Sequence, residues 1–268
     1  MYRPHRLPPT EPPHRAEAVP STIVLMLPAR NEAATVADIV RRAPQVIAGW
    51  PVRVVVVDDG STDSTAAAAA NAGADVVSHD RGRGLGAAVR TGFARALTHH
   101  PIAVAFCDAD GEYAPEELEH IVTPIVDGRA DYVVGSRFTG TIQHMLRRRR
   151  CGNRVLTWAL RRWTGVTITD GQSGYRALSA RAAATVEIAH DYNYAQVMTC
   201  DLIAKGFGYL EVPITYTFRS SGRSFVRLIP YLSHVVPALV QQRRALRNVS
   251  PRQRGSRSLA APPAIASR

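Results

Sequence analysis

Short apolar runs alternate with longer amphipathic stretches along most of the chain, and this alternation limits the folds that the sequence can adopt. The apolar runs cover residues 22–27, 52–57, 74–80, 102–107 and 131–136. Continuous apolar runs bounded by turn residues are typical of strands buried on both faces of a sheet. Strands and helices in strict alternation favour a parallel sheet with right-handed crossovers. The sequence therefore predicts an α/β fold with a mostly parallel central sheet flanked by helices.

Polar segments follow the predicted strands, at the edge where an open α/β sheet binds its ligands. They read PARNE, DDGSTDST, DRGRGLG, DADGE and GSR, and they begin at Pro28, Asp58, Asp80, Asp108 and Gly135. The carboxyl ends of parallel strands meet at one edge of a sheet. We therefore expect these segments to form one site rather than scattered polar loops.

The segment DADGE places Asp108 and Asp110 directly after an apolar run. Two carboxylates at this spacing can reach one divalent cation, and hard oxygen ligands suit Mg²⁺ or Mn²⁺. The alternative is helix capping, since Asp110 and Glu112 precede Pro115 and would complement a helix N-terminus. These residues alone leave both interpretations open.

The segment DDGSTDST also has two interpretations. Its residues can form a turn and an N-cap for the alanine-rich stretch that follows. Two adjacent aspartates, Asp58 and Asp59, are nevertheless costly at a strand end unless something uses them, and a ribose or a base offers suitable hydrogen-bond donors.

Gly82, Gly84 and Ala87 match the pattern G-x-G-x-x-A of dinucleotide-binding loops. That fingerprint follows the first strand of its fold and is completed by an acid about 20 residues on. Here it follows the third predicted strand, and residues 88–100 contain no acid. Nicotinamide binding is therefore not expected.

The charge balance favours phosphate-bearing partners, because the formal net charge is +11 and the sequence pI is about 10.3. Lys205 is the only lysine, and arginine suits bidentate contact with phosphate, although a GC-rich genome would also replace lysine by arginine. Residues 137–163 hold eight arginines and no acid. Trp158 and Trp163 among them suggest nucleic-acid binding. The acidic loops at the sheet edge would repel a phosphate backbone, so no nucleic-acid partner is expected.

The chain is expected to form one domain over residues 21–224, between two disordered tails at 1–20 and 248–268. The first tail is proline-rich and lacks the apolar core of a signal peptide.

Residues 225–247 are apolar but interrupted by Arg227, Pro230 and Pro237, so they are expected to lie on a bilayer rather than cross it. The three cysteines lack metal-ligand spacing. We expect a cytoplasmic protein, peripheral at the inner face of a membrane with an anionic surface.

Seven blocks, in order along the chain, resemble those of family 2 glycosyltransferases of the dolichol-phosphate mannosyltransferase type. The blocks are PARNE, VVDDGSTDST, RGRGLGAAVRTGF, DADGEYAPEEL, VVGSRF, DGQSGYRAL and EVPITYTFRSSGRS, and they span about residues 22–224. The resemblance implies a GT-A fold, a UDP- or GDP-linked sugar donor, a divalent cation on the D-x-D pair, and inversion at the anomeric carbon.

The resemblance also implies roles for the residues at matching positions. The nucleotide sugar would be bound by Pro28, Ala29, Arg30, Asn31, Glu32, Asp58, Asp59, Arg83, Gly84 and Ala109. Asp108 and Asp110 would bind Mg²⁺ or Mn²⁺, and Gln196 would complete the metal shell. The acceptor phosphate and the leaving diphosphate would be surrounded by Arg137, Arg149, Asn153, Ser224 and the catalytic Arg219.

Departures from the family pattern leave the sugar and the acceptor open. Ser224 is followed by Phe225 where relatives often have lysine, and the carboxylate often found just beyond Gln196 is absent. The arginine-rich stretch favours a lipid phosphate, which is already an anion and needs no general base. A sugar or protein hydroxyl needs one, and Asp170 is either that base or a turn residue. A catalytically inactive scaffold is a further alternative, against which the intact D-x-D pair argues.

Overall fold

The structure is a computed structural model that describes residues 21–188 and 194–217. The expected tails at 1–20 and 248–268 and the expected amphipathic segment at 225–247 lie outside the described residues. Arg219 and Ser224, expected at the catalytic and acceptor site, also lie outside them.

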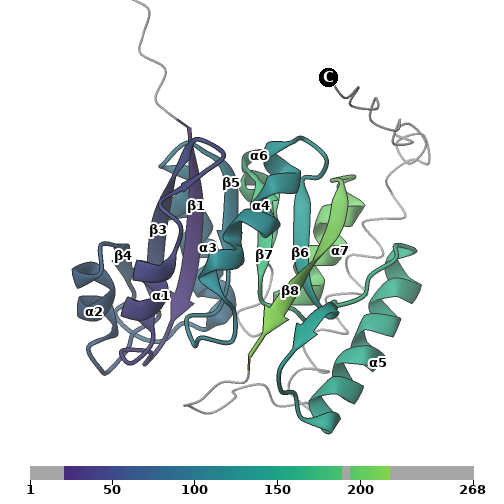
Figure 1. Cartoon of the computed structure of the whole chain (residues 1–268), viewed down its shortest axis with the longest axis horizontal. Coiled ribbons are helices and arrows are strands. Elements are labelled where there is room, and N and C mark those ends of the chain that lie inside the picture. The colour runs from purple at the N-terminus through teal and green to yellow at the C-terminus, as the bar shows by residue number, and fades with distance from the viewer. Residues whose placement is uncertain (1–20, 189–193, 218–268) are drawn as a thin grey trace, which may run out of the picture.

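The described strands form one sheet in the order β2-β3-β1-β5-β7-β6-β8, with β4 paired to β3 (Figure 1). The strands are β1 (Thr22–Ala29), β2 (Val46–Ile47), β3 (Trp50–Asp58), β4 (Asp75–Ser78), β5 (Pro101–Phe106), β6 (Tyr132–Ile142), β7 (Arg176–Ser179) and β8 (Tyr209–Tyr216). The pairs β1–β3, β1–β5, β3–β4 and β6–β8 are parallel, whereas β7 runs antiparallel to both β5 and β6. The predicted α/β fold with a mostly parallel sheet is confirmed.

Helices cover both faces of the sheet. They are α1 (Val36–Arg42), α2 (Thr65–Asn71), α3 (Leu85–Leu97), the short 3-10 helix η1 (Pro115–Glu117), α4 (Leu118–Val126), α5 (Arg147–Thr164), α6 (Ala180–Thr185) and α7 (Ala195–Ala204). Buried side chains of α1, α2 and α4 share one core cluster, and those of α3, α6 and α7 share the cluster on the other face. None of the helices in the described part of the chain is long and apolar enough to span a membrane.

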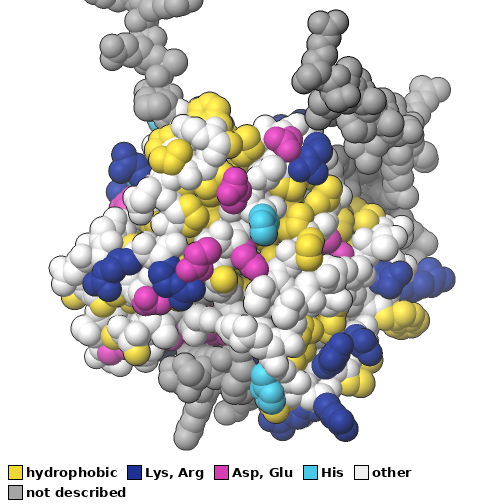
Figure 2. Space-filling view, in the orientation of Figure 1, with side chains coloured by type: hydrophobic (Ala, Val, Ile, Leu, Met, Phe, Trp, Pro, Cys, Tyr) yellow, Lys and Arg dark blue, Asp and Glu magenta, His cyan; other side chains and the backbone are white. Residues whose placement is uncertain are grey.

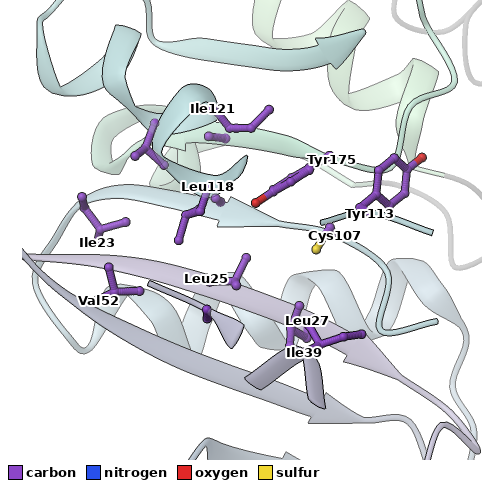
Figure 3. Close-up of a cluster of buried hydrophobic side chains, with 14 of the residues drawn as sticks. Ile23, Leu25, Leu27, Ile39, Val52, Cys107, Tyr113, Leu118, Ile121 and Tyr175 are labelled. Carbon is purple, nitrogen blue, oxygen red and sulfur yellow. The ribbon is translucent and has the colours of Figure 1, made fainter. Parts of the chain in front are cut away.

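Strand β1 shows why the apolar runs are continuous. Ile23, Leu25 and Leu27 pack with the α1 and α4 side, shown in Figure 3, while Val24 and Met26 point to the α3 side. All five side chains are fully buried. Burying one such side chain stabilises the fold by about 1.5–3 kcal/mol. Because both faces are covered, the strand cannot tolerate the apolar–polar alternation of a half-exposed strand.

Two features of the second half of the sheet differ from the sequence-based expectation. The sequence favours a pair of strands over residues 208–218, but the described residues there contribute one strand, β8, which pairs in parallel with β6. Strand β7 is not expected from the sequence, because four residues are too short to show a period of their own. Its place between β5 and β6 is a tertiary result, fixed by antiparallel pairing on both sides.

Candidate functional site

The polar segments do meet at one edge of the sheet. Ala29 at the end of β1 is level with Asp58 at the end of β3, which is level with Ser78 at the end of β4. Phe106 and Val134 both pair with Arg176, so the residues that follow β5 and the continuation of β6 leave the sheet at the same edge. The loops after β1, β3, β4 and β5 therefore form one continuous surface.

The loops after β1 and β3 are joined by hydrogen bonds through Asn31. Its backbone N–H donates to Ser61 Oγ at 2.9 Å, and its side-chain Oδ1 accepts from the backbone of Thr62 at 2.8 Å. Asn31 has a φ of 56°, a left-handed conformation that asparagine tolerates better than most residues. The neighbouring Glu32 N–H donates to Thr65 Oγ1 at 2.9 Å. Pro28 and Ala29 lie buried at the end of β1.

Asp58 and Asp59 are both buried, and groups of the protein itself use their carboxylates. Asp58 accepts from the backbone of Ser61 at 3.0 Å. Asp59 accepts from the backbone N–H groups of Arg83 at 2.8 Å and Gly84 at 2.9 Å, and from His79 Nδ1 at 2.8 Å. The two aspartates thus stabilise the loops that follow β3 and β4. A direct contact of either aspartate with a base or ribose stays a prediction.

Hydrogen bonds set the acidity of Asp59. Burial alone would raise its pKa, but the donors at Arg83, His79 and Gly84 stabilise the ionised form and lower the pKa below its ordinary value. His79 was not identified from the sequence. Its Nε2 contacts Thr91 Oγ1 at 2.9 Å on α3, so the histidine links the aspartate to that helix.

Two glycines permit a close approach of the loops. A Cβ on Gly60, which has a φ of 65°, would lie 2.4 Å from the carbonyl carbon of Arg81. A Cβ on Gly82 would lie 2.5 Å from the guanidinium carbon of Arg30. Arg30 and Arg83 are otherwise exposed. Contact of Arg30 or Arg83 with a nucleotide phosphate stays a prediction.

Asp108 and Asp110 lie half-buried just beyond β5. The carbonyl of Ala109 between them accepts from Thr35 Oγ1 at 2.7 Å, and Asp110 Oδ1 accepts from the backbone of Glu112 at 3.0 Å. The two carboxylates thereby project from a fixed loop. Asp108 also packs against Gly174, where a Cβ would lie 2.8 Å from Asp108 Oδ2.

The stretch does begin a helix at Pro115, but neither Asp110 nor Glu112 caps it through a side-chain hydrogen bond. The N-cap of η1 is Ala114, and neither η1 nor α4 has a side-chain cap. Asp110 instead closes a turn with the backbone two residues on. Across the described residues, no group of three or more His, Cys, Asp or Glu side chains could hold a metal ion. A cation here would have two protein carboxylates, and its other ligands would come from the substrate, from water or from Gln196.

Gln196 lies buried in the first turn of α7, two residues after Tyr194. The Tyr194 ring packs against that of Phe106 at the end of β5, with 5.4 Å between the ring centroids, so this end of α7 is near the acidic loop. Burial and then the charge of Asp108 raise the pKa of Tyr194. The part of Gln196 in a metal shell stays a prediction.

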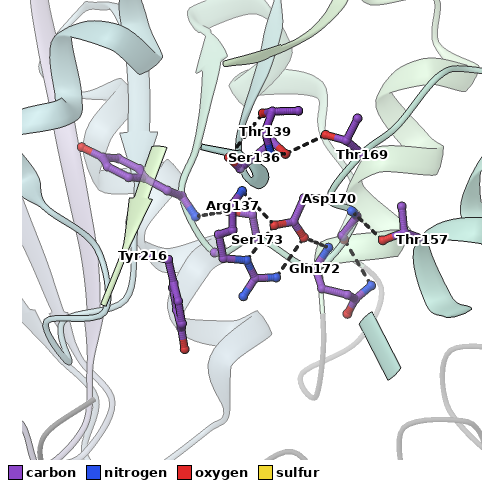
Figure 4. A network of polar contacts seen from close by, with 12 residues as sticks. Ser136, Arg137, Thr139, Thr157, Thr169, Asp170, Gln172, Ser173 and Tyr216 are labelled. Carbon is purple, nitrogen blue, oxygen red and sulfur yellow. Dashed lines mark hydrogen bonds and ion pairs between the residues drawn. The ribbon is translucent and has the colours of Figure 1, made fainter. Parts of the chain in front are cut away.

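Arg137 is buried beside Asp170, as Figure 4 shows. Its Nε and Nη2 donate to the two carboxylate oxygens at 2.6 and 2.9 Å, and its backbone N–H donates at 3.1 Å. The side chains are 1% and 0% exposed. Arg137 therefore has no free face for a phosphate in this structure. Asp170 is a structural partner here, which agrees with the interpretation of it as a turn residue.

Arg149 and Asn153 lie one turn apart on the inner face of α5. Arg149 donates from Nη1 and Nη2 to the Glu112 carboxylate at 3.0 and 3.2 Å, and from Nη1 to the Tyr216 hydroxyl at 2.8 Å. Asn153 Nδ2 is buried and has no hydrogen-bond partner among the described residues. Such a donor is expensive to bury unless a ligand satisfies it.

Arg176, another residue that the sequence did not single out, joins two segments near the site by hydrogen bonds. It is fully buried and donates to the carbonyls of Ser173 at 2.8 Å, Gly171 at 3.1 Å and Ala195 at 2.8 Å. These contacts fix the loop before β7 and the start of α7. Its position within the block DGQSGYRAL is the only sequence signal that could have marked it.

Comparison with known proteins gives concordant results. The model of the glycosyl transferase family 2 matches residues 24–186. Polyprenol monophosphomannose synthase of Mycolicibacterium smegmatis is 34% identical over 226 residues, which cover 80% of this chain and 84% of that protein. UDP-N-acetylglucosamine–dolichyl-phosphate N-acetylglucosaminyltransferase of Methanococcus voltae is 28% identical over 228 residues, covering 75% and 88%.

Among solved structures, glucosyl-3-phosphoglycerate synthase from Mycobacterium tuberculosis, in complex with Mn²⁺, UDP-glucose and glycerol 3-phosphate, shares the fold. Its TM-score is 0.67 at 24% sequence identity, over 83% of this chain and 80% of that one. The sheet order, the loops at its edge and the family match agree with the GT-A fold that the seven blocks imply. The chain therefore belongs to glycosyl transferase family 2 and is a glycosyltransferase.

Proposed function

We propose that the protein transfers a sugar from a nucleoside diphosphate donor to a polyprenyl phosphate, with a divalent cation and with inversion at the anomeric carbon. The observation that carries the proposal is the position of Arg149, which is paired with Glu112 in the loop that also carries Asp108 and Asp110. Asn153, one turn further along α5, adds a buried donor without a partner among the described residues. A pair of carboxylates for a metal and a cationic, hydrogen-bonding helix face for a phosphate lie side by side. The names of the two relatives above, which specify polyprenol and dolichyl phosphate products or acceptors, support this acceptor class.

The residues at the sheet edge fit a bound Mg²⁺ or Mn²⁺. Asp108 and Asp110 offer hard oxygen ligands on a fixed loop that is half open to the solvent. The bound ion would offset the negative charge that develops on the leaving diphosphate. Gln196 is proposed as a further ligand. The crystal structure of the M. tuberculosis synthase with Mn²⁺ and UDP-glucose supports the metal at the level of the fold.

The other candidate residues of the site are proposed to bind and orient the two substrates. Arg30, Asn31 and Glu32, with the loop that Asp59 holds, are proposed to bind the nucleotide. Arg149 and Asn153 are proposed to orient the acceptor phosphate toward the sugar. Arg219 and Ser224 are proposed for the same phosphates from the resemblance alone. A phosphate acceptor is already ionised at neutral pH, so no side chain has to remove a proton from it.

Melting curves test the donor half of the proposal. A ligand at 100 times its Kd stabilises a folded protein by about 2.7 kcal/mol, which raises Tm by roughly 5–10 °C for a chain of this size. We expect UDP or GDP to give such a shift with Mn²⁺ and not with EDTA. Asp110→Asn should lose the shift. If neither nucleotide raises the Tm of the folded protein, the chain is an inactive scaffold and the proposal fails.

Transfer of labelled sugar tests the acceptor half. With a polyprenyl phosphate present, the label should enter the organic phase. Label that stays in the aqueous phase on a sugar or a protein would exclude the lipid acceptor while leaving the transferase activity intact.

Helix α5 supports a membrane location for this reaction. Its outer face exposes Val155 at 58% and Trp158 at 67%, and Leu146 before it is 39% exposed. Figure 2 shows basic side chains over α5. The exposed arginines of this helix are Arg147, Arg148, Arg150, Arg154, Arg161 and Arg162. Apolar burial plus about 1 kcal/mol for each basic residue near anionic lipid favours peripheral binding.

We therefore propose that α5 lies on the cytoplasmic leaflet. The protein should sediment with anionic liposomes at low salt, and Trp158→Ala should sediment less. Equal sedimentation of wild type with anionic and zwitterionic liposomes would contradict the electrostatic part of this proposal.

A further inference from the structure

His79 joins three elements at the edge of the sheet that carries the site. It directly follows β4, and its backbone N–H donates to the carbonyl of Asp58, at the end of β3, at 2.9 Å. Its Nδ1 lies 2.8 Å from Asp59 Oδ1, and its Nε2 lies 2.9 Å from Thr91 Oγ1 on α3. The side chains of His79 and Asp59 are only 5% and 6% exposed. Both ring nitrogens of a nearly buried histidine are therefore in use.

The partners of the ring determine which nitrogen carries the proton. Burial raises the pKa of Asp59, but its hydrogen-bond donors lower the pKa by more, so the carboxylate is ionised at neutral pH and can only accept. Nδ1 of His79 must then donate to it. In the neutral ring, Nε2 accepts from the Thr91 hydroxyl. A ring turned by 180° about its bond to Cβ would present carbon atoms to both partners, so these two contacts fix its orientation.

The Asp59 carboxylate also fixes the residues that begin α3. It accepts from the backbone N–H groups of Arg83 at 2.8 Å and Gly84 at 2.9 Å. Gly84 is the N-cap residue of α3, and the first turn of this helix contains no acid. Negative charge near a helix N-terminus is stabilising. Asp59 therefore supplies, from the end of another strand, a charge that the sequence of α3 lacks.

The loop between β4 and α3 needs contacts of this kind to be ordered. Residues 80–83 are exposed, and both Gly82 and Gly84 belong to the loop. Glycine loses more conformational freedom on ordering than any other residue. The hydrogen bonds from Arg83 and Gly84 to Asp59 hold the end of the loop that leads into α3. His79 in turn gives the buried carboxylate a side-chain donor.

We propose that His79 is a positioning residue for nucleotide binding, which holds Asp59 so that Arg83 and Gly84 are in place before the nucleotide arrives. The inference rests on the proposed function, because that function supplies the nucleotide and assigns this loop to it. His79 does not touch the nucleotide. Without the hydrogen bond from Nδ1, the Asp59 carboxylate is free to rotate, and the nucleotide has to order the loop as it binds. The cost of that ordering falls on the affinity for the nucleotide.

Two substitutions separate the two ring nitrogens. The amide nitrogen of asparagine is bonded to Cγ, as Nδ1 is, so His79→Asn keeps a donor for Asp59. The amide nitrogen of glutamine is one bond further out, as Nε2 is, so His79→Gln keeps only a partner for Thr91. The full chain is titrated calorimetrically with UDP and with GDP in the presence of Mn²⁺. His79→Asn should bind the nucleotide within about two-fold of the wild-type Kd, and His79→Gln about ten-fold more weakly, the order expected for a lost hydrogen bond to a charged group. Equal Kd values for the two variants would overturn the inference.

Thr91→Val is the matched control on the other side of the ring. It removes the hydroxyl that contacts Nε2 and leaves the hydrogen bond from Nδ1 to Asp59 in place. Because Nε2 then lies buried without its partner, Tm should fall, while the Kd for the nucleotide should stay at the wild-type value. If Thr91→Val weakens nucleotide binding as much as His79→Gln does, the effect comes from the packing of α3 and the inference is wrong.

Hydrogen exchange of the wild type provides a measurement that needs no variant. The amides of Arg83 and Gly84 should exchange more slowly than in an unstructured peptide, even without nucleotide, because Asp59 already accepts from both. If they exchange at the unstructured rate until the nucleotide is added, the loop is not held in advance and the inference fails. Failure of the proposed function is seen separately, as a wild type that binds neither UDP nor GDP with Mn²⁺. A wild type that binds the nucleotide no better than His79→Gln does refutes only the positioning role.

Discussion

The buried ion pair between Arg137 and Asp170 gives a prediction whose magnitude follows from the structure. Asp170 accepts three hydrogen bonds from Arg137 and one from the backbone of Gln172 at 3.2 Å. Replacing Asp170 by Asn removes the charge but little volume. It leaves the Arg137 guanidinium buried without a counter-charge, since that side chain is 1% exposed. Breaking a buried pair in this way costs about 3–5 kcal/mol.

Urea denaturation measures this loss as the free energy of unfolding. At about 2–4 °C per kcal/mol for a chain of this size, Tm should also fall by roughly 10 °C. Arg137→Met should cost a similar amount. The double variant should be less destabilised than the sum of the two, with an interaction of about 1–3 kcal/mol, because neither charge then remains alone.

The same variant separates the two interpretations of Asp170. As a structural residue, it should reduce stability first, and the activity of the folded fraction should remain measurable at low temperature. The reasoning is refuted if Asp170→Asn unfolds within about 1 kcal/mol of the wild type but transfers no sugar. That result would identify Asp170 as a general base and point to a hydroxyl acceptor.

Two other predictions concern the loops of the site. The pKa of Asp59 is lowered in the folded protein, so its ionised form adds stability above the ordinary aspartate pKa of 3.8, and this contribution is lost as pH falls through the lowered value. Asp59→Asn should therefore flatten the acid limb of a Tm–pH profile, and an unchanged limb would contradict this. A Cβ at Gly174 would lie 2.8 Å from Asp108 Oδ2 and 3.1 Å from Tyr113, so Gly174→Ala should weaken Mn²⁺ binding in a calorimetric titration. The control is Gly152→Ala on α5, where the added Cβ has no atom within 4 Å. This variant should raise the free energy of unfolding by up to about 1 kcal/mol and leave the affinity for Mn²⁺ unchanged. Equal Mn²⁺ affinities in the two variants would count against the packing argument.

Much of the fold could be predicted from the sequence because its first half is built from local signals. The apolar run at 22–27 predicts β1, and the run at 102–107 predicts β5. Their burial on both faces follows from the absence of alternation. The second half could not be predicted in the same way. The four residues of β7 are too few for a pattern, and the strand exists because β5 and β6 pair with it on either side.

The candidate site shows the same division. The position of Asp108 and Asp110 after a buried strand was sufficient to predict a carboxylate pair at the sheet edge. The use of Asp59 by His79 and by the backbone of Gly84 was not predictable, because it joins groups 20 and 25 residues apart through the packing of a loop. The sequence indicated that Asp58 and Asp59 have hydrogen-bond donors as partners, and the structure shows that these donors belong to the protein itself.

By itself, the sequence determined the alternation of strands and helices from β1 to β6, apart from the two-residue β2, together with the edge of the sheet that carries the chemistry and the residue types available there. Only the tertiary structure decided which charges cancel. Arg137 meets Asp170 across 33 residues, and Arg149 meets Glu112 across 37. In the sequence, both arginines are equal members of a basic stretch. The physical reason is that a pattern along the chain reports burial and local conformation, whereas the pairing of two charges depends on which distant segments the crossovers and β-pairings bring into contact.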